Sequence, residues 1–438
     1  MRENALCAFA AMGGCAIIAW LGLYGFAWND YEMEAQPSFS ALAHGHFVEF
    51  LELAPAYGGS LVMRAPFALL PNLWGGGELA VYRMIALPCL LAAVVLAVWL
   101  CARMRGAGHS TLSRAVAVGV CAANPIALFA LEYGHAEEIL GACLCVAAVA
   151  VAGRASLGPR RVVWAGVLLG LALANKPWAL LAVGPVLLAL APHAGAWRWR
   201  PAIACMASAL AVTALVLAPL TIASRGGLAH QALAVPAQEI FQPWQVWWFL
   251  GTPNHVPAPH GEVHSVPLNA PLSTHPQWRI APSWLSGITH PLIVLLAIPL
   301  TLLAWRSRRT VGAALRLLAL LLLLRCVLDP WDISYYPLPF LLALLAWEVS
   351  ARTSRPPVLA LASTALAWIS FGWLPAHIAP DVQSAFFLAW SLPLACWLGA
   401  QLAQVTVVSA FGSEVRTSGP SSPTTTRSSI LTPSSPGR

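Results

Sequence analysis

Four short stretches of this sequence concentrate side chains that can move protons or bind anions. The first is WNDYEMEA, residues 28–35, where Asp30, Glu32 and Glu34 follow the first long apolar run. Only 17 of the 438 residues are acidic, so three acids in five positions are informative. Partial desolvation raises the pKa of a carboxylate at a membrane–water boundary and suits it to general-base work. The alternative is a solvated loop just past a helix end.

The second stretch is LANKPWALL, residues 173–181, which holds the only lysine of the chain. An ionisable side chain in an apolar hairpin is expensive and is a functional candidate by default. Pro177 predicts that the helix is broken at Lys176, and Asn175 is a candidate cap for the restarted helix. Lysine beside a helix N-terminus suits a phosphate. The alternative is a lysine that snorkels from a helix end.

The third stretch, LEYGHAEEIL, places five polar residues in a predicted turn between two spans: Glu132, Tyr133, His135, Glu137 and Glu138. The HExxH spacing of a zinc site is absent, and no second histidine is near. Groups that bind sugar hydroxyls or an acceptor fit this set better than metal ligands do. The alternative is a polar hairpin tip.

The fourth stretch is LRCVLDPWDISYYPLPF, residues 324–340. Arg325 and Asp329 are four residues apart and are predicted to pair near the end of a span. Asp332 and Tyr335 follow and are candidates for substrate hydroxyls, or for orienting a cation such as Arg325. An interfacial aromatic belt is the alternative.

Composition indicates that a membrane positions these stretches. The chain is 59% hydrophobic and 9% charged, with a mean hydropathy of +0.71, whereas soluble domains carry about a quarter charged residues. Apolar runs of near bilayer length recur from end to end. The formal charge of +7 comes from short arginine clusters between these runs. Such clusters are typical of cytoplasmic loops, and no nucleic-acid partner is expected.

The arginine clusters also predict the topology. Each interval between them holds two crossings, so the clusters and both termini lie on one side, which the positive-inside rule makes cytoplasmic. The predicted spans are residues 5–28, 80–101, 115–131, 137–153, 162–174, 178–191, 202–223, 286–304, 311–328, 337–349, 358–373 and 384–408. We therefore expect an all-α, polytopic transmembrane helix bundle of about twelve spans, with long outer segments at 29–79 and 224–285.

The domain organisation follows from the same pattern. Residues 1–412 form the predicted membrane domain, and 413–438, rich in Ser, Thr and Pro, form a predicted disordered cytoplasmic tail. All acids except Glu3, Glu348 and Glu414 then face outward, which suggests chemistry on the outer face of the cell membrane. The ten cysteines show no disulfide or zinc spacing and are expected to be small apolar fillers.

The second outer segment is less informative. Its stretch FQPWQVWWFLG either lies in the membrane interface or covers a substrate groove. Four histidines in this segment lack ligand spacing, so no metal site is predicted there: His255, His260, His264 and His275.

Together these residues resemble the C-type, multi-spanning glycosyltransferases that use polyprenyl-phosphate sugars, most of all glycosyltransferase family 87, the polyprenol-phosphate-mannose-dependent mannosyltransferases. The features that carry the resemblance are WNDYEMEA, YGGSLVMRAPFALL in the first outer segment, GHAEE, NKPWALL and RCVLDPWDISYYPLPF. The likeness is spread over residues 5–408. The arginine- and alanine-heavy composition suggests a high-GC bacterial source, and hence a role in the cell envelope.

The resemblance implies inverting transfer of mannose or another hexose or pentose from a polyprenyl-phosphate donor to a lipid or glycan acceptor. Asp30 would be the base, with Glu32 and Glu34 left open. The donor phosphate would be bound by Lys176, Arg64 and Arg325. The sugar or acceptor would be held by His135, Glu138, Asp329, Asp332 and Tyr335. No cofactor is implied, and a need for a divalent metal is left open.

A transporter or lipid flippase is the alternative from a different class. Transporters tend to show internal repeats and broken helices at the bilayer midplane. This sequence shows no repeat, and its polar residues gather at the predicted outer ends of the spans. These features favour the enzyme.

Overall fold

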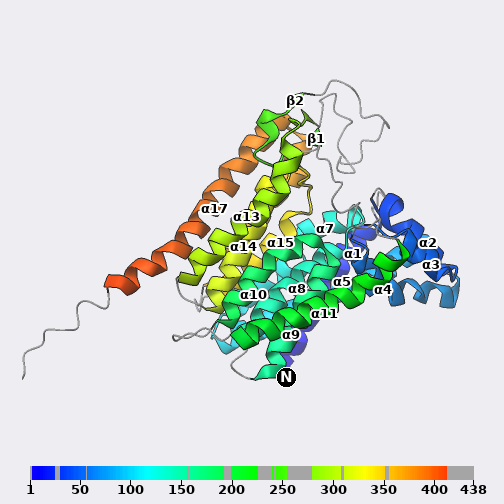
Figure 1. Cartoon of the computed structure of the whole chain (residues 1–438), viewed down its shortest axis with the longest axis horizontal. Helices are drawn as coiled ribbons and strands as arrows, with labels where there is room; N and C mark the ends of the chain where they lie inside the picture. The colour runs from blue at the N-terminus through cyan, green and yellow to red at the C-terminus, as the bar shows by residue number, and fades with distance from the viewer. Residues whose placement is uncertain are drawn as a thin grey trace, which may run out of the picture.

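The chain folds as a bundle of apolar helices (Figure 1). The computed structural model describes residues 2–24, 30–55, 57–154, 158–191, 199–224, 239–240, 243–253, 279–306, 310–350 and 355–411. The predicted tail at 413–438 and the four histidines between 255 and 275 lie outside these ranges.

The longer helices follow the apolar runs of the sequence. They are α1 (Arg2–Tyr24), α5 (Glu78–Gly106), α6 (Thr111–Ala122), α7 (Pro125–Glu132), α8 (Glu137–Ala152), α9 (Pro159–Asn175), α10 (Val183–Leu190), α11 (Trp199–Ala223), α13 (Leu285–Arg306), α14 (Val311–Leu328), α15 (Pro337–Ser350), α16 (Val358–Trp368) and α17 (Pro380–Phe411). Short 3-10 or π-helical turns, labelled η, are η1 (Tyr31–Ala35), η2 (Leu70–Trp74), η4 (Pro177–Ala182), η5 (Trp248–Leu250), η6 (Ile369–Trp373) and η7 (Leu374–Ala376).

Helical segments therefore occupy every predicted span. Among the described residues, eight helical segments are long and apolar enough to cross a membrane. This count takes α6 together with α7, and α16 together with the turns that follow it. The others, which include α8, α9 and α15, are shorter. The predicted class, a helical multi-pass membrane protein, is confirmed by these apolar helices. The span count of about twelve stays a prediction.

Burial separates a central layer of helices from a peripheral one. Nearly every side chain of α15 is buried, and most of those of α8 and α14 are buried as well. In contrast, only 17% of the most apolar window of α11 or of α13 is buried, and large apolar side chains such as Leu215 and Ile298 are exposed there. Exposed apolar surface along whole helices is the pattern expected of a lipid-facing layer.

The first predicted outer segment is helical rather than an extended loop. Besides η1 and η2 it contains α2 (Gln36–Ala43), α3 (Phe47–Glu52) and α4 (Gly59–Ala68). Helix α3 lies against α11, and α4 lies against α5 and α9. This packing brings side chains of the first segment to the bundle end where α9 stops.

The Trp-rich part of the second segment packs on the protein. Trp244 and Trp248 are 2% and 1% exposed, so these two side chains pack against the protein itself. Whether the stretch lies in the membrane interface or covers a substrate groove stays a prediction. The Trp247 indole donates to the Leu328 carbonyl at 2.7 Å, which satisfies one free carbonyl at the end of α14. The Trp248 indole donates to Asp381, the first acid of α17, at 2.8 Å.

A small antiparallel sheet closes this segment. Strands β1 (Glu239–Ile240) and β2 (Thr252–Pro253) both pair with β3 (Arg279–Ile280), in the order β1-β3-β2. Arg279 also forms an ion pair with Asp381 at 2.7 Å. The sequence analysis did not predict these strands, because two-residue strands leave no period to detect.

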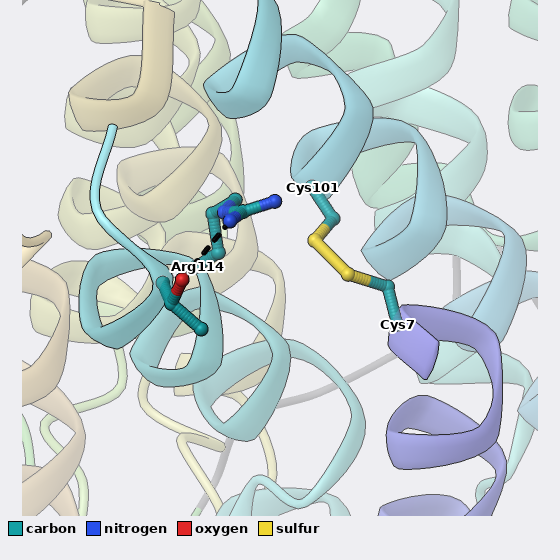
Figure 2. Close-up of a disulfide and its surroundings, with 4 residues drawn as sticks. Cys7, Cys101 and Arg114 are labelled. Carbon is teal, nitrogen blue, oxygen red and sulfur yellow. Dashed lines mark hydrogen bonds between the residues drawn. A yellow bond between two sulfur atoms is a disulfide. The ribbon is translucent and has the colours of Figure 1, made fainter. Parts of the chain in front are cut away.

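A disulfide joins Cys7 of α1 to Cys101 of α5 (Figure 2). The prediction that every cysteine is an apolar filler is therefore wrong for this pair. No sequence spacing indicated it, because the two residues are 94 positions apart and meet only through packing of α1 on α5. Seven of the eight free cysteines are buried, as fillers would be, and Cys396 is exposed.

The turn between α7 and α8 is set by a glycine. The amide of Gly134 donates to Leu131 and that of His135 donates to Ala130, which together form a Schellman cap at the end of α7. Gly134 has a φ of +90°, and a Cβ on it would lie 2.6 Å from the Cβ of Tyr31. This turn therefore presents His135 to the segment that begins at Asp30.

We predict that Gly134→Ala lowers the unfolding temperature more than Gly45→Ala does. Both glycines have positive φ, but a Cβ on Gly45 would meet no atom within 4 Å. The strain of a left-handed alanine, of order 1–3 kcal/mol, is therefore common to both variants. The contact with Tyr31 is specific to Gly134. Thermal unfolding in detergent measures the difference, and equal shifts would contradict this account of the turn.

Candidate functional site

A buried group of charged side chains lies where several helices begin or end at one end of the bundle. Glu137 and Glu138 are in the first turn of α8, Lys176 follows the end of α9, and Arg325 is in the last turn of α14. Arg64 comes from α4. Three of the four predicted site stretches thus meet here with Arg64, although they are far apart in the sequence.

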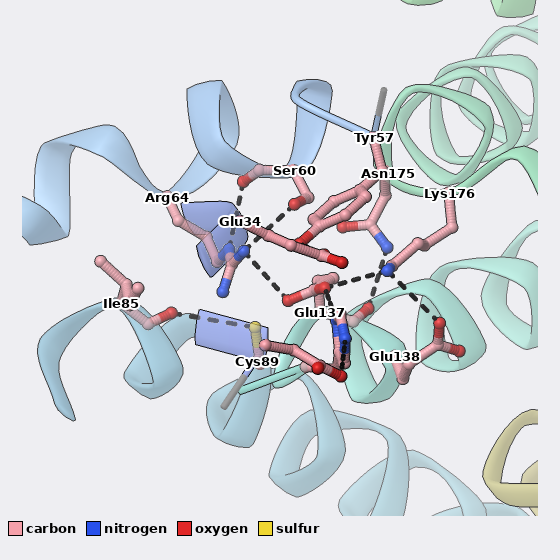
Figure 3. Close-up of polar contacts among 12 residues, drawn as sticks. Glu34, Tyr57, Ser60, Arg64, Ile85, Cys89, Glu137, Glu138, Asn175 and Lys176 are labelled. Carbon is pink, nitrogen blue, oxygen red and sulfur yellow. Dashed lines mark hydrogen bonds and ion pairs between the residues drawn. The ribbon is translucent and has the colours of Figure 1, made fainter. Parts of the chain in front are cut away.

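Glu137 is the centre of this group (Figure 3). It is 0% exposed, and three cationic groups converge on its carboxylate. Nη2 of Arg64 and Nζ of Lys176 each lie 3.0 Å from it, and Nδ1 of His135 lies 2.8 Å away. The Asn175 amide donates to the backbone carbonyl of Glu137 at 2.9 Å. Burial of a carboxylate is tolerated only with such compensation.

The helix break predicted at Lys176 is confirmed. Helix α9 ends at Asn175, and Lys176 adopts an extended conformation before η4 begins at Pro177. The predicted capping role of Asn175 is wrong, because Lys176 takes the capping position without a side-chain bond and Asn175 points to Glu137 instead. A Cβ on Gly59 would lie 2.1 Å from the carbonyl oxygen of Ala174, so only glycine lets α4 approach this break.

Asp30 lies at the edge of the group. Its Oδ2 is 3.0 Å from Nε2 of His135, and its side chain is 25% exposed, against 6% for His135. Burial and the charge of Lys176 lower the pKa of His135, but its hydrogen bonds with Asp30 and Glu137 outweigh them and raise the pKa to about 9. The imidazole is therefore protonated near neutral pH and donates to a carboxylate from each nitrogen.

The structure separates the three acids of the opening stretch. Glu34 is half-buried and accepts a hydrogen bond from the Tyr57 hydroxyl. The Tyr57 ring lies 3.8 Å from Nζ of Lys176, so Glu34 reaches the group through this tyrosine. Glu32 is exposed and forms no hydrogen bond or ion pair with the residues that the structure describes. Asp30 alone of the three contacts the charged group directly.

Glu138 links this half of the site to Arg325. Its carboxylate is 3.7 Å from Nζ of Lys176 and 3.9 Å from Nη1 of Arg325, and it accepts a hydrogen bond from the Trp178 indole at 3.1 Å. The Arg325 guanidinium lies 3.9 Å from the centre of the Tyr336 ring. Aromatic rings therefore form part of the wall around these charges.

The predicted pairing of Arg325 with Asp329 is wrong. Asp329 is 3.6 Å from His290 of α13 and accepts a hydrogen bond from the amide of Trp331 at 3.0 Å. The physical reason is that α14 ends at Leu328 and Asp329 is extended, so the four-residue helical spacing does not apply to its side chain.

Asp332 and Tyr335 occupy separate places in the site. Asp332 is 0% exposed, and no described residue forms a hydrogen bond with either of its carboxylate oxygens. Burial raises the pKa of Asp332 well above its usual range, and the neighbouring Asp329 adds to this while Arg325 opposes it. The Tyr335 ring is 4.8 Å from the His135 ring, so Tyr335 belongs with the Asp30 edge.

Sequence reasoning missed several members of the site. Glu137 was expected only to share in binding sugar hydroxyls or an acceptor, although an acid in the first turn of an apolar helix could have been weighed more heavily. Trp178 lies in the stretch around Lys176 but was given no role, and Tyr57 and His290 have mostly apolar neighbours in sequence that do not distinguish them. Among the residues that the structure describes, no three His, Cys, Asp or Glu side chains are arranged to hold a metal ion.

Comparisons with known proteins add no family to this picture. No protein-family model matches the chain, and neither the curated proteins nor the solved structures give a match.

We predict that Glu137→Gln destabilises the protein by about 3–5 kcal/mol, the usual effect of removing one partner from a buried ion pair. Arg64, Lys176 and His135 would lose the carboxylate that they share. Exposed Glu49 pairs with His46, so Glu49→Gln serves as the control. Thermal or denaturant unfolding measures both variants, and equally small effects would show that Glu137 is not the centre of the group.

We also predict a pH dependence of stability that comes from His135. The pKa of its imidazole is raised from 6.5 to about 9 by folding, so its contribution is complete below about pH 6.5 and is lost as pH rises through about 9. The difference in unfolding temperature between wild type and His135→Asn should therefore be larger at pH 6 than at pH 9.5. A difference that does not change with pH would contradict the protonated imidazole.

Proposed function

We propose that this protein is an integral-membrane glycosyltransferase that moves a sugar from a polyprenyl-phosphate donor to an acceptor on the outer face of the membrane. One observation carries the proposal: Asp30, a partly exposed carboxylate, borders a buried group of cations inside an apolar helix bundle. A base and an anion site side by side at membrane depth are what transfer from a lipid phosphate requires.

In this mechanism Asp30 is the general base. It takes the proton of the acceptor hydroxyl as that oxygen forms a bond to the anomeric carbon. The bond from that carbon to the phosphate oxygen breaks, and polyprenyl phosphate leaves with inverted configuration at the sugar. The partial exposure of Asp30 supports this role, since an acceptor hydroxyl must reach the base. His135 holds the carboxylate in place through its 3.0 Å contact.

Lys176 and Arg325 would stabilise the leaving phosphate. Both are nine-tenths buried and both approach Glu138, so a phosphate near this carboxylate would lie within reach of both cations. Arg64 was predicted to join them. It is 1% exposed and bound to Glu137 and Ser60, so we assign it instead to positioning Glu137.

The sugar and acceptor would contact the remaining polar and aromatic side chains of the site. Asp332 and Asp329 lie near enough to Arg325 for its charge to act on the carboxyl of Asp332. The Tyr335 ring packs against the His135 ring, next to Asp30. Carboxyl groups and aromatic faces together suit a sugar, which has hydroxyls around its ring and apolar C–H faces. Mannose or another hexose or pentose fits this description. The donor would enter sideways from the membrane lipid.

Transport remains the second candidate, because the α9 helix breaks at a buried lysine. Broken helices whose ends face an ion or substrate are typical of secondary transporters. The break at Lys176 has this form. A transporter would move the lipid phosphate or its sugar without forming a glycosidic bond, so product analysis separates the two functions.

We predict that Asp30→Asn abolishes sugar transfer or lowers it at least about 100-fold, as expected for loss of a general base. Membranes that contain wild type or variant receive a labelled polyprenyl-phosphate sugar, and glycosylated acceptor is measured. Asparagine keeps the size of the side chain and can still accept a hydrogen bond from His135, but it removes the charge that is paired with the imidazolium. Transfer is therefore compared at equal amounts of folded protein, with the unfolding temperature of both proteins measured alongside.

Exposed Glu52→Gln removes an acid outside the site and is the control, for which we expect wild-type transfer. Transfer that survives in Asp30→Asn would move the base to Glu34, and then to Glu32. Absence of transfer by wild type with every donor tested would contradict the enzyme and favour transport.

A further inference from the structure

Arg325 is buried without the partners that such a residue normally has. It is 5% exposed, and its Nη1 has no hydrogen-bond partner among the residues that the structure describes. Its ion pair with Oε2 of Glu138 spans 3.9 Å, whereas hydrogen bonds between guanidinium and carboxylate are about 2.7–2.9 Å long. Burial makes an unsatisfied charge costly, so this arginine retains unused capacity to bind an anion.

Glu138 is held in a similarly incomplete way. It is 1% exposed, and within the described part of the chain its Oε2 has no hydrogen-bond partner. Its Oε1 accepts one hydrogen bond from the Trp178 indole but lies 3.7 Å from Nζ of Lys176. The carboxylate therefore sits between two cations and makes a short contact with neither.

The neighbouring Glu137 has closer charged partners in the same site, although its Oε2, like that of Glu138, makes an ion pair rather than a hydrogen bond with the described residues. Lys176, His135 and Arg64 approach it within 3.0 Å, 2.8 Å and 3.0 Å. Two adjacent acids in the first turn of α8 therefore differ in how closely their charged partners approach. Glu137 is fixed by close partners, while Glu138 is retained mainly by long-range attraction and one indole N–H.

We propose that Glu138 is an internal competitor of the donor: its carboxylate occupies the place between Lys176 and Arg325 that the donor's phosphate ester takes on binding. This inference rests on the proposed function and gives Glu138 a role other than sugar binding. A phosphate group is larger than a carboxylate and offers more oxygens, so it can contact both cations at hydrogen-bond distance. Two anions repel each other at such a site, so Glu138 turns away as the phosphate enters.

The competition has a use at the end of the reaction. The leaving polyprenyl phosphate carries more negative charge than the sugar-bearing donor, and it would bind tightly to two buried cations. The return of Glu138 neutralises Lys176 and Arg325 as the product departs. The site therefore limits its own affinity for product without any further ligand.

The test measures binding by the purified full-length protein in detergent. The probes are a short-chain prenyl phosphate, the same lipid carrying the sugar, and inorganic phosphate. Glu138→Gln keeps the shape of the side chain and removes its charge, so we expect the prenyl phosphate to bind at least about fivefold more tightly than to wild type, close to 1 kcal/mol. Arg325→Gln should bind it at least about tenfold more weakly.

Two further variants serve as control and second test. Exposed Glu52→Gln removes one acid elsewhere and should bind like wild type. Glu138→Asp shortens the side chain and withdraws the carboxylate from the cations, so it should also tighten binding. It keeps the proposal testable if Glu138→Gln does not fold. If inorganic phosphate also binds the Glu138 variants more tightly than it binds wild type, the proposal is supported, and the phosphate group rather than the lipid chain is what the site recognises.

Three outcomes would overturn the proposal. Binding that is unchanged or weaker in both Glu138 variants, with sugar transfer by wild type intact, would remove the competitor and leave the proposed function standing. If the Glu138 variants bind the sugar-carrying lipid more weakly than wild type but bind the prenyl phosphate as wild type does, Glu138 is a sugar ligand and not a competitor. If wild type neither binds the prenyl phosphate nor transfers sugar, the proposed function is wrong, and so is the proposed role of Glu138 as a competitor.

Discussion

The buried carboxylate of Glu137 is the interaction on which the rest of the site depends. Its three cationic partners come from α4, from the turn before α8 and from the end of α9. None of these segments could bury its charge alone, because an uncompensated ion in an apolar bundle costs several kcal/mol. The shared carboxylate makes their burial mutually dependent. The ends of the helices are therefore fixed relative to one another by charge as well as by apolar packing.

This arrangement also explains why reactive groups gather where helices end. Within a span the backbone groups bond to one another, and side chains face lipid or neighbouring helices. At the end of α9 the chain turns, Lys176 becomes extended, and Asn175 is free to bind the carbonyl of Glu137. At the end of α14 the Trp247 indole takes a carbonyl that the helix leaves unpaired. Irregular backbone therefore supplies both the positions and the hydrogen-bonding groups for chemistry.

The sequence predicted the helical membrane class well and the site only in part. Apolar runs and arginine clusters are local patterns, and each predicted span contains helical structure. Scarce charges in apolar surroundings singled out Asp30, His135, Lys176 and Arg325, and the structure brings these residues into one group. Partners could not be predicted, because Glu137 binds Arg64 across 73 positions of sequence. The predicted pairing of Arg325 with Asp329 was wrong because it assumed that Asp329 is helical, whereas α14 ends at Leu328.

The antiparallel pairing of Pro253 with Arg279 fixes two points of the chain that are 26 positions apart. Paired strands lie about 4.8 Å apart, so these two residues are neighbours in space. Arg279 is also bound to Asp381 of α17 and to the Trp248 carbonyl. The sheet is therefore anchored to a membrane-length helix by a charge as well as by its own backbone, and a movement of α17 at this end would be transmitted to the Trp-rich segment.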